Sequence, residues 1–384
     1  MVQTAVVVGA GIGGLAVATA LAQRGIAVTV VEQANEISEV GAGLQISPNG
    51  LAVLEALGVT PGLHARNAVV GEAVVLEDFR QGREVARLDL TRLQDRAYLF
   101  VHRADLVNAL VDAAQKADVA LVLGDRAVKV EPGPKPFAVF EGRGTERSDL
   151  IVCADGLHSV GRPAVTGQSA AEFTGQVAWR ATVPATTSDA RVHVTMGPGR
   201  HIVRYPIRGK RVLNLVALQE RRGWAEEGWH HLDDPANLRA AFADFGGDVS
   251  SVLERVDKVH LWGLFRHPVA ETWARNGAAL LGDAAHPTLP FLAQGANLAL
   301  EDAWVLAASV VSGAGLDRYQ SLRKARVTRV IKAASANAWK YHLRPGPFRW
   351  AAHRALQLGS RAAPDRMVRQ FDWIYGYDAT RVEP

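Results

Sequence analysis

The 384-residue sequence contains a single cysteine, and this scarcity excludes two kinds of protein. One cysteine cannot build a disulfide scaffold or a cysteine-based zinc site, and its rarity suits a reducing cytoplasm. Charged residues make up only 21% of the chain and hydrophobic residues 48%, which excludes intrinsic disorder. A basic segment followed by a cleavage site is also lacking at the start, so no signal peptide is expected. These absences predict a globular, cytoplasmic protein.

One long uncharged stretch resembles a membrane segment in length. Residues 4–23 carry no charge and are long enough to cross a bilayer. They contain several glycines and begin with a short run rich in valine, which is typical of a buried strand, a turn and a helix. We therefore expect no membrane segment.

The charge is distributed unevenly, although the net charge is only +4. From Arg318 onward there are 14 lysines and arginines against 4 acidic residues. Because these basic residues are spread singly among apolar ones, the pattern favours a solvated or subunit-facing helical surface over a nucleic-acid interface. We expect no nucleic-acid partner, and a monomer or a homodimer.

The order of patterns predicts an α/β protein with two lobes. Residues 5–8, 12–24 and 26–31 read as strand, helix and strand, a βαβ unit. Residues 173–266 mostly alternate with a period of two, which indicates an antiparallel sheet, and residues 278 onward return to a buried strand and a helix. The predicted divisions are a discontinuous Rossmann-like domain (1–72, 97–172 and 268–345), an inserted, mainly antiparallel domain (73–96 and 173–267) and a C-terminal helical segment (346–384).

The first motif is a G-x-G-x-x-G sequence formed by Gly9, Gly11 and Gly14, directly after a strand and at the start of a helix. The first glycine allows a tight turn, the second lets a pyrophosphate approach the backbone, and the third lets helix and strand pack closely. Glu32 ends the next strand, where an acidic side chain can accept the ribose hydroxyls of an adenosine. The motif predicts a dinucleotide site without distinguishing NAD from FAD.

Two further motifs follow strands later in the chain. Asp155 and Gly156 end one apolar strand, and Gly282 and Asp283 end another, ahead of a QGANLALEDA helix. With these three motifs in this order, the sequence resembles the single-component flavoprotein aromatic-ring hydroxylases over nearly its whole length, and it is most similar to the salicylate, 3-hydroxybenzoate and 6-hydroxynicotinate branch. The resemblance implies that the Rossmann-like domain is an FAD-binding domain and that the inserted domain is the substrate-binding domain. It also implies transient NADH or NADPH, and the single G-x-G-x-x-G after a strand agrees with the lack of a separate nicotinamide domain.

The resemblance also implies individual roles. Asp283 would bind a ribityl hydroxyl of FAD, Arg103 would reach the cofactor, and Asp155 would lie near the flavin and the nicotinamide path. Each residue could instead have a purely structural role. Asp283 could cap a helix, Arg103 could form a surface ion pair and Asp155 could stabilise a turn. The full predicted cofactor-binding set is Gly9, Gly11, Gly13, Gly14, Glu32, Gln45, Arg103, Asp155, Asp283, Pro290, Gly295, Ala296 and Asn297.

The predicted substrate residues lie mostly on one strand. His201 and Tyr205 share a face of an alternating strand, and in the branch named above a histidine and a tyrosine at matching positions line the substrate pocket. His201 is predicted to remove a phenolic proton and Tyr205 to orient the substrate, unless both side chains only hydrogen-bond within the sheet. Gln294 is predicted to contact substrate, and Arg180 and Arg204 are candidates for binding its carboxylate.

The sequence therefore predicts an FAD-dependent monooxygenase that hydroxylates a small hydroxylated aromatic acid through a flavin C4a-hydroperoxide, using NAD(P)H and O2. A second possibility within the fold is a larger aromatic substrate, such as a quinolone, phenazine or antibiotic. An NAD-dependent dehydrogenase without flavin and a non-catalytic FAD-binding protein are the competing hypotheses from different classes of protein. The twelve histidines show no ligand-like spacing, so no metal site is predicted.

Overall fold

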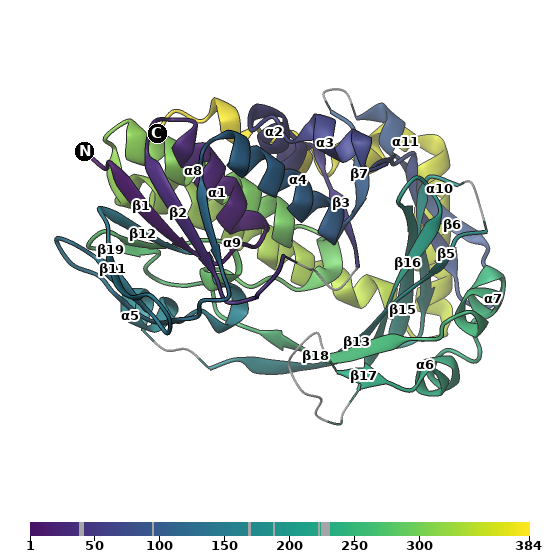
Figure 1. Cartoon of the computed structure of the whole chain (residues 1–384). Coiled ribbons are helices and arrows are strands. Elements are labelled where there is room, and N and C mark those ends of the chain that lie inside the picture. The colour runs from purple at the N-terminus through teal and green to yellow at the C-terminus, as the bar shows by residue number, and fades with distance from the viewer. Residues whose placement is uncertain (38–41, 94–95, 168–169, 187–188, 222, 224–230) are drawn as a thin grey trace.

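The computed structural model describes the chain except at residues 38–41, 94–95, 168–169, 187–188, 222 and 224–230. The described chain forms two lobes, each built on one large β-sheet (Figure 1). Helices cover the sheet that contains the N-terminal strand, whereas the other sheet lies at the far side of the molecule (Figure 1). This arrangement confirms the predicted α/β fold with a second, mainly antiparallel sheet.

The sheet of the first lobe has six strands in the order β19-β20-β12-β1-β2-β8. Neighbouring strands are parallel, except that β19 is antiparallel to β20. Their bounds are β1 (Thr4–Val8), β2 (Ala27–Glu32), β8 (Ala120–Leu123), β12 (Leu150–Cys153), β19 (Ala274–Arg275) and β20 (Ala278–Leu280). Because parallel neighbours need long crossover connections, this sheet joins segments that are far apart in the sequence.

The turn between β1 and α1 (Ile12–Ala22) requires two glycines. Gly9 has a φ of +99°, which only glycine adopts readily, and a Cβ there would lie 2.7 Å from the carbonyl oxygen of Ala154. A Cβ on Gly14 would lie 2.0 Å from the carbonyl oxygen of Gly9. The βαβ unit is therefore packed backbone against backbone at this turn, as the motif predicted.

The second lobe contains an eight-stranded sheet in the order β17-β18-β13-β16-β15-β14-β5-β6. Neighbouring strands are antiparallel except β14 and β5, which run parallel because their segments are joined through the first lobe. The bounds are β5 (Ala73–Asp78), β6 (Glu84–Asp89), β13 (Glu172–Pro184), β14 (Arg191–Gly197), β15 (Arg200–Ile207), β16 (Val212–Glu220), β17 (Leu232–Asp233) and β18 (Val259–Arg266).

The two faces of this sheet have different partners, because alternate residues point to opposite sides. Trp179 and Ile202 belong to a buried cluster with Phe242 and Val252, at helices α6 (Pro235–Ala241) and α7 (Asp248–Glu254). The opposite face, which carries His201 and Tyr205, borders the cavity described below.

The remaining elements complete the first lobe and connect the two. The smaller sheets contain β3 (Gly43–Ile46), β7 (Leu99–His102) and β4 (Val69–Val70), and β11 (Gly144–Arg147), β10 (Phe137–Phe140) and β9 (Ala127–Glu131). The other helices of this part are α2 (Pro48–Ala56), α3 (Thr60–Ala65), α4 (Arg103–Lys116), α5 (Arg162–Thr166) and α8 (Gly295–Val311). Short 3-10 turns are η1 (Leu90–Arg92), η2 (Gly156–His158), η3 (Gly282–Ala284), η4 (Pro290–Leu292) and η5 (Ala379–Arg381).

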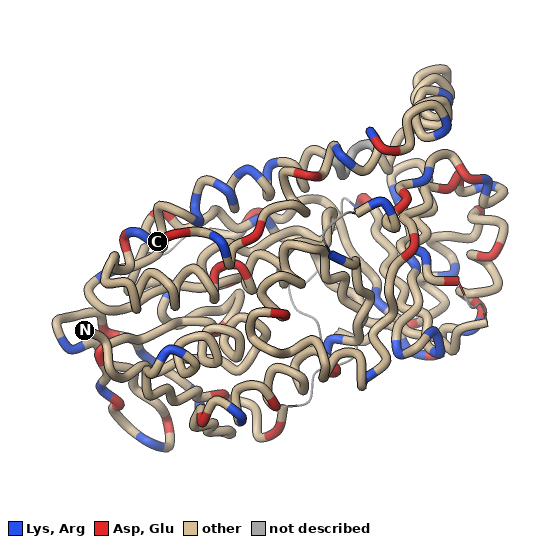
Figure 2. Tube along the Cα trace, turned by 90° about the horizontal axis from the view of Figure 1, so that it is seen from above, with Lys and Arg blue, Asp and Glu red and all other residues tan. Residues whose placement is uncertain are grey.

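Helices form the C-terminal part of the chain. The long α9 (Gly315–Tyr341) packs on α8, and α10 (Pro347–Ala362) and α11 (Pro364–Arg369) pack against β6 of the other lobe, ahead of α12 (Asp372–Tyr375). Basic residues are scattered along these helices rather than gathered in one block, although Arg323 and Lys324 are adjacent (Figure 2). No described helix combines the length and the apolar character that a membrane crossing needs.

Candidate active site

A cavity of about 510 Å³ is lined by residues of both lobes. One end, here called the loop end, is lined by the turn after β1, the start of α4 and the segments that follow β12 and β20. The other, the sheet end, is lined by one face of the eight-stranded sheet and by the C-terminal helices. The loop end thus lies beyond the carboxyl ends of parallel strands, where open α/β sheets bind ligands.

Most of the predicted site residues line this cavity. Those at the loop end and its boundary are Gly11, Gly13, Gln45, Arg103, Asp283, Pro290, Gln294, Gly295 and Ala296. His201 and Tyr205 line the sheet end, which confirms that they share one face of β15. Among the described lining residues, the predicted residues Gly9, Gly14, Glu32, Asp155 and Asn297 do not occur.

Glu32 stabilises the glycine turn. Its Oε2 accepts a hydrogen bond from the Ala10 N–H at 2.8 Å, and its Oε1 accepts one from the Ala34 N–H at 2.9 Å. The carboxylate therefore orders the segment after β1, and its binding of a ribose stays a prediction.

Asp155 and Asn297 also have local partners. Oδ2 of Asp155 accepts the N–H of Val160 at 2.8 Å, whereas its Oδ1 is buried and has no hydrogen-bond partner in the described part of the chain. Burial raises the pKa of Asp155. Asn297 accepts the Ser47 N–H at 3.1 Å and donates to the Gln45 carbonyl at 3.0 Å, so its side chain fixes the segment ahead of α2 against α8.

Gln294 is engaged in the same way. Its amide donates to the Ser47 hydroxyl at 3.0 Å and accepts from Asn49 at 3.1 Å. Both the oxygen and the nitrogen of the side-chain amide therefore have protein partners, and Gln294 shapes the wall of the cavity. Its predicted contact with substrate stays a prediction.

Asp283 and Arg103 place opposite charges at the loop end. Surrounding protein atoms raise the pKa of the Asp283 carboxyl, although its side chain is accessible from the cavity. The neighbouring His286 and Arg103 act in the opposite direction and lower it. A carboxylate accepts hydrogen bonds from hydroxyl groups strongly, and a guanidinium attracts anionic groups, so this pair suits a ligand with both.

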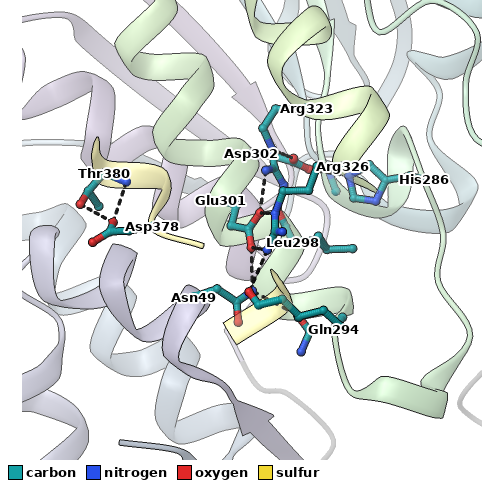
Figure 3. A network of polar contacts seen from close by, with 12 residues as sticks. Asn49, His286, Gln294, Leu298, Glu301, Asp302, Arg323, Arg326, Asp378 and Thr380 are labelled. Atoms are coloured by element: carbon teal, nitrogen blue, oxygen red, sulfur yellow. Dashed lines mark hydrogen bonds and ion pairs between the residues drawn. The ribbon is translucent and has the colours of Figure 1, made fainter. Parts of the chain in front are cut away.

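A buried network of ion pairs fixes the loop end from behind (Figure 3). Arg323 on α9 lies 2.6 Å from Oε2 of Glu301 and 2.7 Å from Oδ1 of Asp302, both on α8, and all three side chains are fully buried. Arg326 also pairs with Glu301 at 2.7 Å, and Asn49 donates to the same carboxylate at 2.6 Å. Two carboxylates and two guanidinium groups therefore balance in charge at the α8–α9 contact.

Asp302 extends this network to the motif after β20. Its Oδ2 accepts the Gly282 N–H at 3.3 Å and pairs with the ring of His286. Burial alone would raise the pKa of Asp302, but His286 and Arg323 outweigh it and the pKa is lowered. His286 therefore has a structural partner, and the network holds the loop that carries Asp283.

The sheet end is mostly apolar. Its apolar lining consists of Val74, Leu76, Leu88, Val192, Val194, Met196, Val203, Val216, Leu218 and Phe291, with Leu356 and Met367 from the C-terminal helices and Phe371 from the turn before α12. Among these side chains lie the polar groups of Arg180, His201 and Tyr205. A few polar groups in an apolar chamber are typical of a site that orients a small organic ligand.

Arg180 and Tyr205 face the same chamber from neighbouring parts of the sheet. The Arg180 guanidinium lies over the ring of Trp262, 5.2 Å from its centroid, and its charge lowers the pKa of the Tyr205 hydroxyl, which burial raises. Gln45 hydrogen-bonds to Tyr205 and accepts the hydroxyl of Tyr98 at 3.0 Å. Arg204 points to the opposite face, where it pairs with Glu77 at 3.0 Å, so it is not placed to bind a ligand in the cavity.

His201 is buried, and among the described residues the side chain of His342 is the one hydrogen-bonding partner of its ring. Its Nδ1 lies 2.7 Å from Nε2 of His342, which follows α9, and Nδ1 of His342 lies 2.9 Å from Oε1 of Glu220. Burial lowers the pKa of His201 well below 6.5, and His342 lowers it further. The ring is therefore neutral at neutral pH and able to accept a proton.

Several lining or supporting residues were missed from the sequence. Tyr98, Tyr341 and Tyr375 line the cavity, and His342 and Glu220 lie behind His201. They come from different elements and share no spacing or motif. The sequence therefore offered no signal for them, apart from the aromatic content of the C-terminal segment.

The glycine turn suits the pyrophosphate of a dinucleotide. A Cβ on Gly11 would meet nothing within 4 Å, so the backbone there is open to the cavity, and no side chain caps the N-terminus of α1. Oriented N–H groups at such a helix start bind phosphate. Together with the charged pair of Asp283 and Arg103, this arrangement suits a dinucleotide cofactor. The FAD binding domain family matches residues 1–334, and the chain belongs to this family.

Curated relatives and solved structures agree with this assignment. The chain is 34% identical over 388 residues to a 3-amino-4-hydroxybenzoate 2-monooxygenase of Streptomyces cremeus, covering 97% of this chain and 95% of that protein. It is 30% identical over 394 residues to a 3-hydroxybenzoate 6-hydroxylase of Polaromonas naphthalenivorans, with coverage of 97% and 95%. The protein is therefore an FAD-dependent monooxygenase.

Two solved structures show the same fold. Klebsiella pneumoniae HpxO, complexed with FAD and uric acid, has a TM-score of 0.84 and 25% identity over 97% of each chain. A salicylate hydroxylase substrate complex has a TM-score of 0.80 and 22% identity, covering 100% of this chain and 98% of that one.

Proposed function

We propose that the protein hydroxylates a small aromatic acid that carries a phenolic hydroxyl, such as a hydroxybenzoate, with NADH or NADPH as the reductant and O2 as the oxidant. The observation that carries this proposal is the trio of Arg180, His201 and Tyr205 in an otherwise apolar chamber that adjoins the loop end. The names of the relatives, hydroxybenzoate hydroxylases and monooxygenases, support the same substrate class.

Arg180 is proposed to bind the substrate carboxylate. Among the described lining residues it is the one lysine or arginine at the sheet end, since Arg103 lies at the loop end. A guanidinium binds a carboxylate through paired hydrogen bonds, which fixes the orientation of the ring as well as its position. An apolar chamber strengthens this interaction because it excludes water.

His201 is proposed to accept the phenolic proton. A neutral imidazole is the form that can act as a base, and the lowered pKa of His201 keeps the ring neutral when no acid is bound. The phenolate that results is a more electron-rich ring than the phenol. When bound and reduced, FAD supplies the activation of O2 that side chains lack.

Tyr205 and the apolar lining are proposed to position the ring and to keep water out. The hydroxyl of Tyr205 hydrogen-bonds to Gln45, near the loop end. The apolar side chains of β5, β14 and β16 that line the chamber would surround the substrate ring. The absence of a second G-x-G-x-x-G after a strand supports a nicotinamide that visits transiently. The same proposal includes a cytoplasmic protein without a nucleic-acid or membrane partner, as a monomer or homodimer.

The test compares acids that differ by one functional group. The purified yellow protein is mixed with NADH or NADPH and with salicylate, 3-hydroxybenzoate, 4-hydroxybenzoate, 3-amino-4-hydroxybenzoate or 6-hydroxynicotinate. Benzoate, which lacks the hydroxyl, and phenol, which lacks the carboxylate, are the matched controls. Hydroxylated product and hydrogen peroxide are measured together with nicotinamide oxidation.

We expect one hydroxylated acid to accelerate nicotinamide oxidation and to give an equivalent amount of product, while benzoate and phenol do neither. Peroxide as the only product with every acid would overturn the proposed substrate class and favour a larger aromatic substrate. A protein that oxidises no nicotinamide under any condition would overturn the proposed reductant.

A further inference from the structure

A chain of three hydrogen-bonding side chains leads away from the sheet end of the cavity. His201 lines the cavity, His342 lies behind it and Glu220 follows at the end of β16. The donor–acceptor distances are 2.7 Å and 2.9 Å, within the normal range for hydrogen bonds. The three residues come from β15, the segment after α9 and β16, so only the folded chain brings them together.

Solvent exposure increases sharply along this chain. His201 is 2% exposed and the side chain of His342 is also 2% exposed, whereas the side chain of Glu220 is 48% exposed. The chain therefore joins a buried nitrogen at the cavity to a carboxylate that is in contact with bulk water. A buried base needs such a route if it is to release protons during turnover.

The carboxylate fixes the positions of the ring protons. An ionised Glu220 can only accept, so Nδ1 of His342 donates to it and Nε2 of the same neutral ring is left as an acceptor. Nδ1 of His201 must then donate to that Nε2. Nε2 of His201 is left without a proton, and it makes no hydrogen bond with the described residues. The nitrogen that remains for a ligand is therefore a base.

The protein packing keeps both rings in place. The His342 carbonyl accepts the Gly199 N–H at 3.2 Å, and the Glu220 N–H donates to the Gly199 carbonyl at 2.8 Å, so the β14–β15 turn holds the backbones of His342 and Glu220 in place. The rings of Tyr341 and Phe291 lie 5.2 Å and 6.3 Å from the His201 ring. These contacts restrict the imidazole without supplying another charged partner.

We propose that His342 and Glu220 form a proton path that sets the tautomer of His201 and carries the phenolic proton of the substrate from the cavity to solvent. This inference rests on the proposed function of His201 as the base. His342 and Glu220 are positioning residues, since neither lines the cavity.

The transfer balances without any further reactant. The phenolic O–H bond breaks and an Nε2–H bond forms on His201, while its Nδ1 proton passes to Nε2 of His342. The Nδ1 proton of His342 then passes to the carboxylate of Glu220, which exchanges it with water. The electron pair stays on the substrate as phenolate. Protonation of the product phenolate along the same path in reverse restores both starting tautomers.

The first test measures the tautomers in the resting, FAD-bound protein, independently of any substrate. Imidazole nitrogen resonances are recorded by NMR with 15N-labelled histidine and assigned by comparison with His201→Gln and His342→Phe. We expect both rings to be neutral near pH 7 and protonated at Nδ1. A proton on Nε2 of His201 in the wild type would overturn the proposed path, whatever the enzyme hydroxylates.

The second test follows ionisation of a bound phenol. 3-Hydroxy-4-nitrobenzoate, whose phenolate absorbs visible light, is titrated with pH on the wild type, Glu220→Gln and His342→Phe, each with its FAD content measured. Glu254→Gln, an exposed glutamate on α7 of the same lobe, is the matched control. The titratable groups facing His201 are Tyr341 at the end of α9, His342 directly after it, Tyr205 on β15 and Arg180 on β13. All of them stay unchanged in Glu220→Gln.

We expect Glu220→Gln to lower the fraction of bound phenol that is ionised on the acid side of the titration, because it removes a negative charge that stabilises the protonated His201–His342 pair beside the phenolate. With the hydroxylated substrate, we expect kcat of His342→Phe to fall about 10- to 100-fold, the lower part of the range for general acid–base groups, with KM within about threefold. The path would be overturned if Glu220→Gln and His342→Phe both ionised the phenol and turned over like the wild type while only His201→Gln lost kcat. That outcome would leave the proposed function standing.

Discussion

The two ends of the cavity are built in different ways. The loop end consists largely of backbone: glycines at the turn after β1, the start of α8 and the segment after β20, supported by buried ion pairs. The sheet end consists of side chains from alternate positions of several strands and from the C-terminal helices α9 to α12. At the glycines of the loop end, a substitution changes the surface only by adding atoms, whereas each substitution at the sheet end replaces a side chain that a ligand would contact.

This difference explains what each end can specify. Backbone N–H groups at a helix start recognise phosphate whatever the sequence around them, so the loop end suits a cofactor shared by a whole family. Side chains that alternate along a strand can be exchanged without changing the ladder, so the sheet end suits selection of a particular substrate. The predictions below test this division from its largest expected effect to its smallest.

Adding one methyl group to the loop end should have the largest effect. In Gly14→Ala the new Cβ would lie 2.0 Å from the Gly9 carbonyl oxygen, and backbone cannot move aside as a side chain could. We expect little folded, FAD-bound protein, measured as flavin absorbance per polypeptide and by thermal unfolding.

Gly11→Ala is the matched control for that change. Its Cβ would meet nothing within 4 Å, and its φ of −72° suits alanine. We expect the melting temperature of the FAD-free protein to stay near the wild-type value, while FAD binds about 10- to 100-fold more weakly, roughly 1.4–2.8 kcal/mol. Equal loss of stability in the two variants would contradict a backbone-built loop end.

Breaking the ion network should destabilise the protein without altering a lining residue. Arg323→Met leaves Asp302 buried without its guanidinium partner, and we expect a loss of about 3–5 kcal/mol in the free energy of unfolding. Urea unfolding checks this value. Arg275→Met, at an exposed position, is the control and should unfold like the wild type.

The network also predicts a pH dependence. Because the pKa of Asp302 is lowered in the folded protein, its stabilisation is present above the unfolded pKa near 3.8 and is lost as the pH falls through the folded value. We therefore expect the wild type to lose stability below about pH 4 more steeply than Asp302→Asn. Parallel acid-unfolding curves for the two proteins would contradict this assignment.

At the sheet end, Arg180→Met should weaken substrate binding. Removing a charged hydrogen-bond partner costs about 1.5–3 kcal/mol, so we expect KM for the aromatic acid to rise about 10- to 100-fold. Arg180→Lys keeps the charge but lacks the paired donors, so its KM should lie between those of the wild type and Arg180→Met. Steady-state kinetics distinguish these outcomes, and FAD content should stay at the wild-type level in both variants. A loss of FAD instead would show that the two ends are not separable.

Tyr205→Phe should have the smallest effect of the set. It removes one hydroxyl whose hydrogen bond to Gln45 is worth about 0.5–1.5 kcal/mol, and leaves the ring packing intact. We expect a change in KM of about tenfold or less, with kcat for the preferred acid almost unchanged. A kcat that collapses as in His201→Gln would assign Tyr205 to proton transfer rather than to positioning.

The sequence predicted the loop end better than the sheet end for a physical reason. Gly9, Gly11 and Gly14 lie within six residues of one another, so their roles can be inferred from local spacing. The partnership of His201 with His342 crosses 141 residues and depends on where α9 ends against the β14–β15 turn. No local pattern encodes that contact.

The same limit applied to single side chains. Arg180 and Arg204 were equivalent candidates in the sequence, and only the pleat of β13 and β15 sends one toward the cavity and the other to Glu77. The motif around Asn297 and Gln294 predicts that they contact a ligand. Their side chains also hydrogen-bond to Ser47, and no sequence motif indicates that contact.

The strand order has a consequence for how the chain is made. In the first sheet β1 lies between β2 and β12, and β12 is followed by β20, whose residues are 278–280; in the second, β14 pairs with β5. During synthesis, β1 of the first lobe therefore emerges from the ribosome long before β12, which is one of its two neighbours in the sheet. Neither lobe corresponds to one continuous stretch of sequence, so cutting the gene at a lobe boundary yields fragments with unpaired sheet edges.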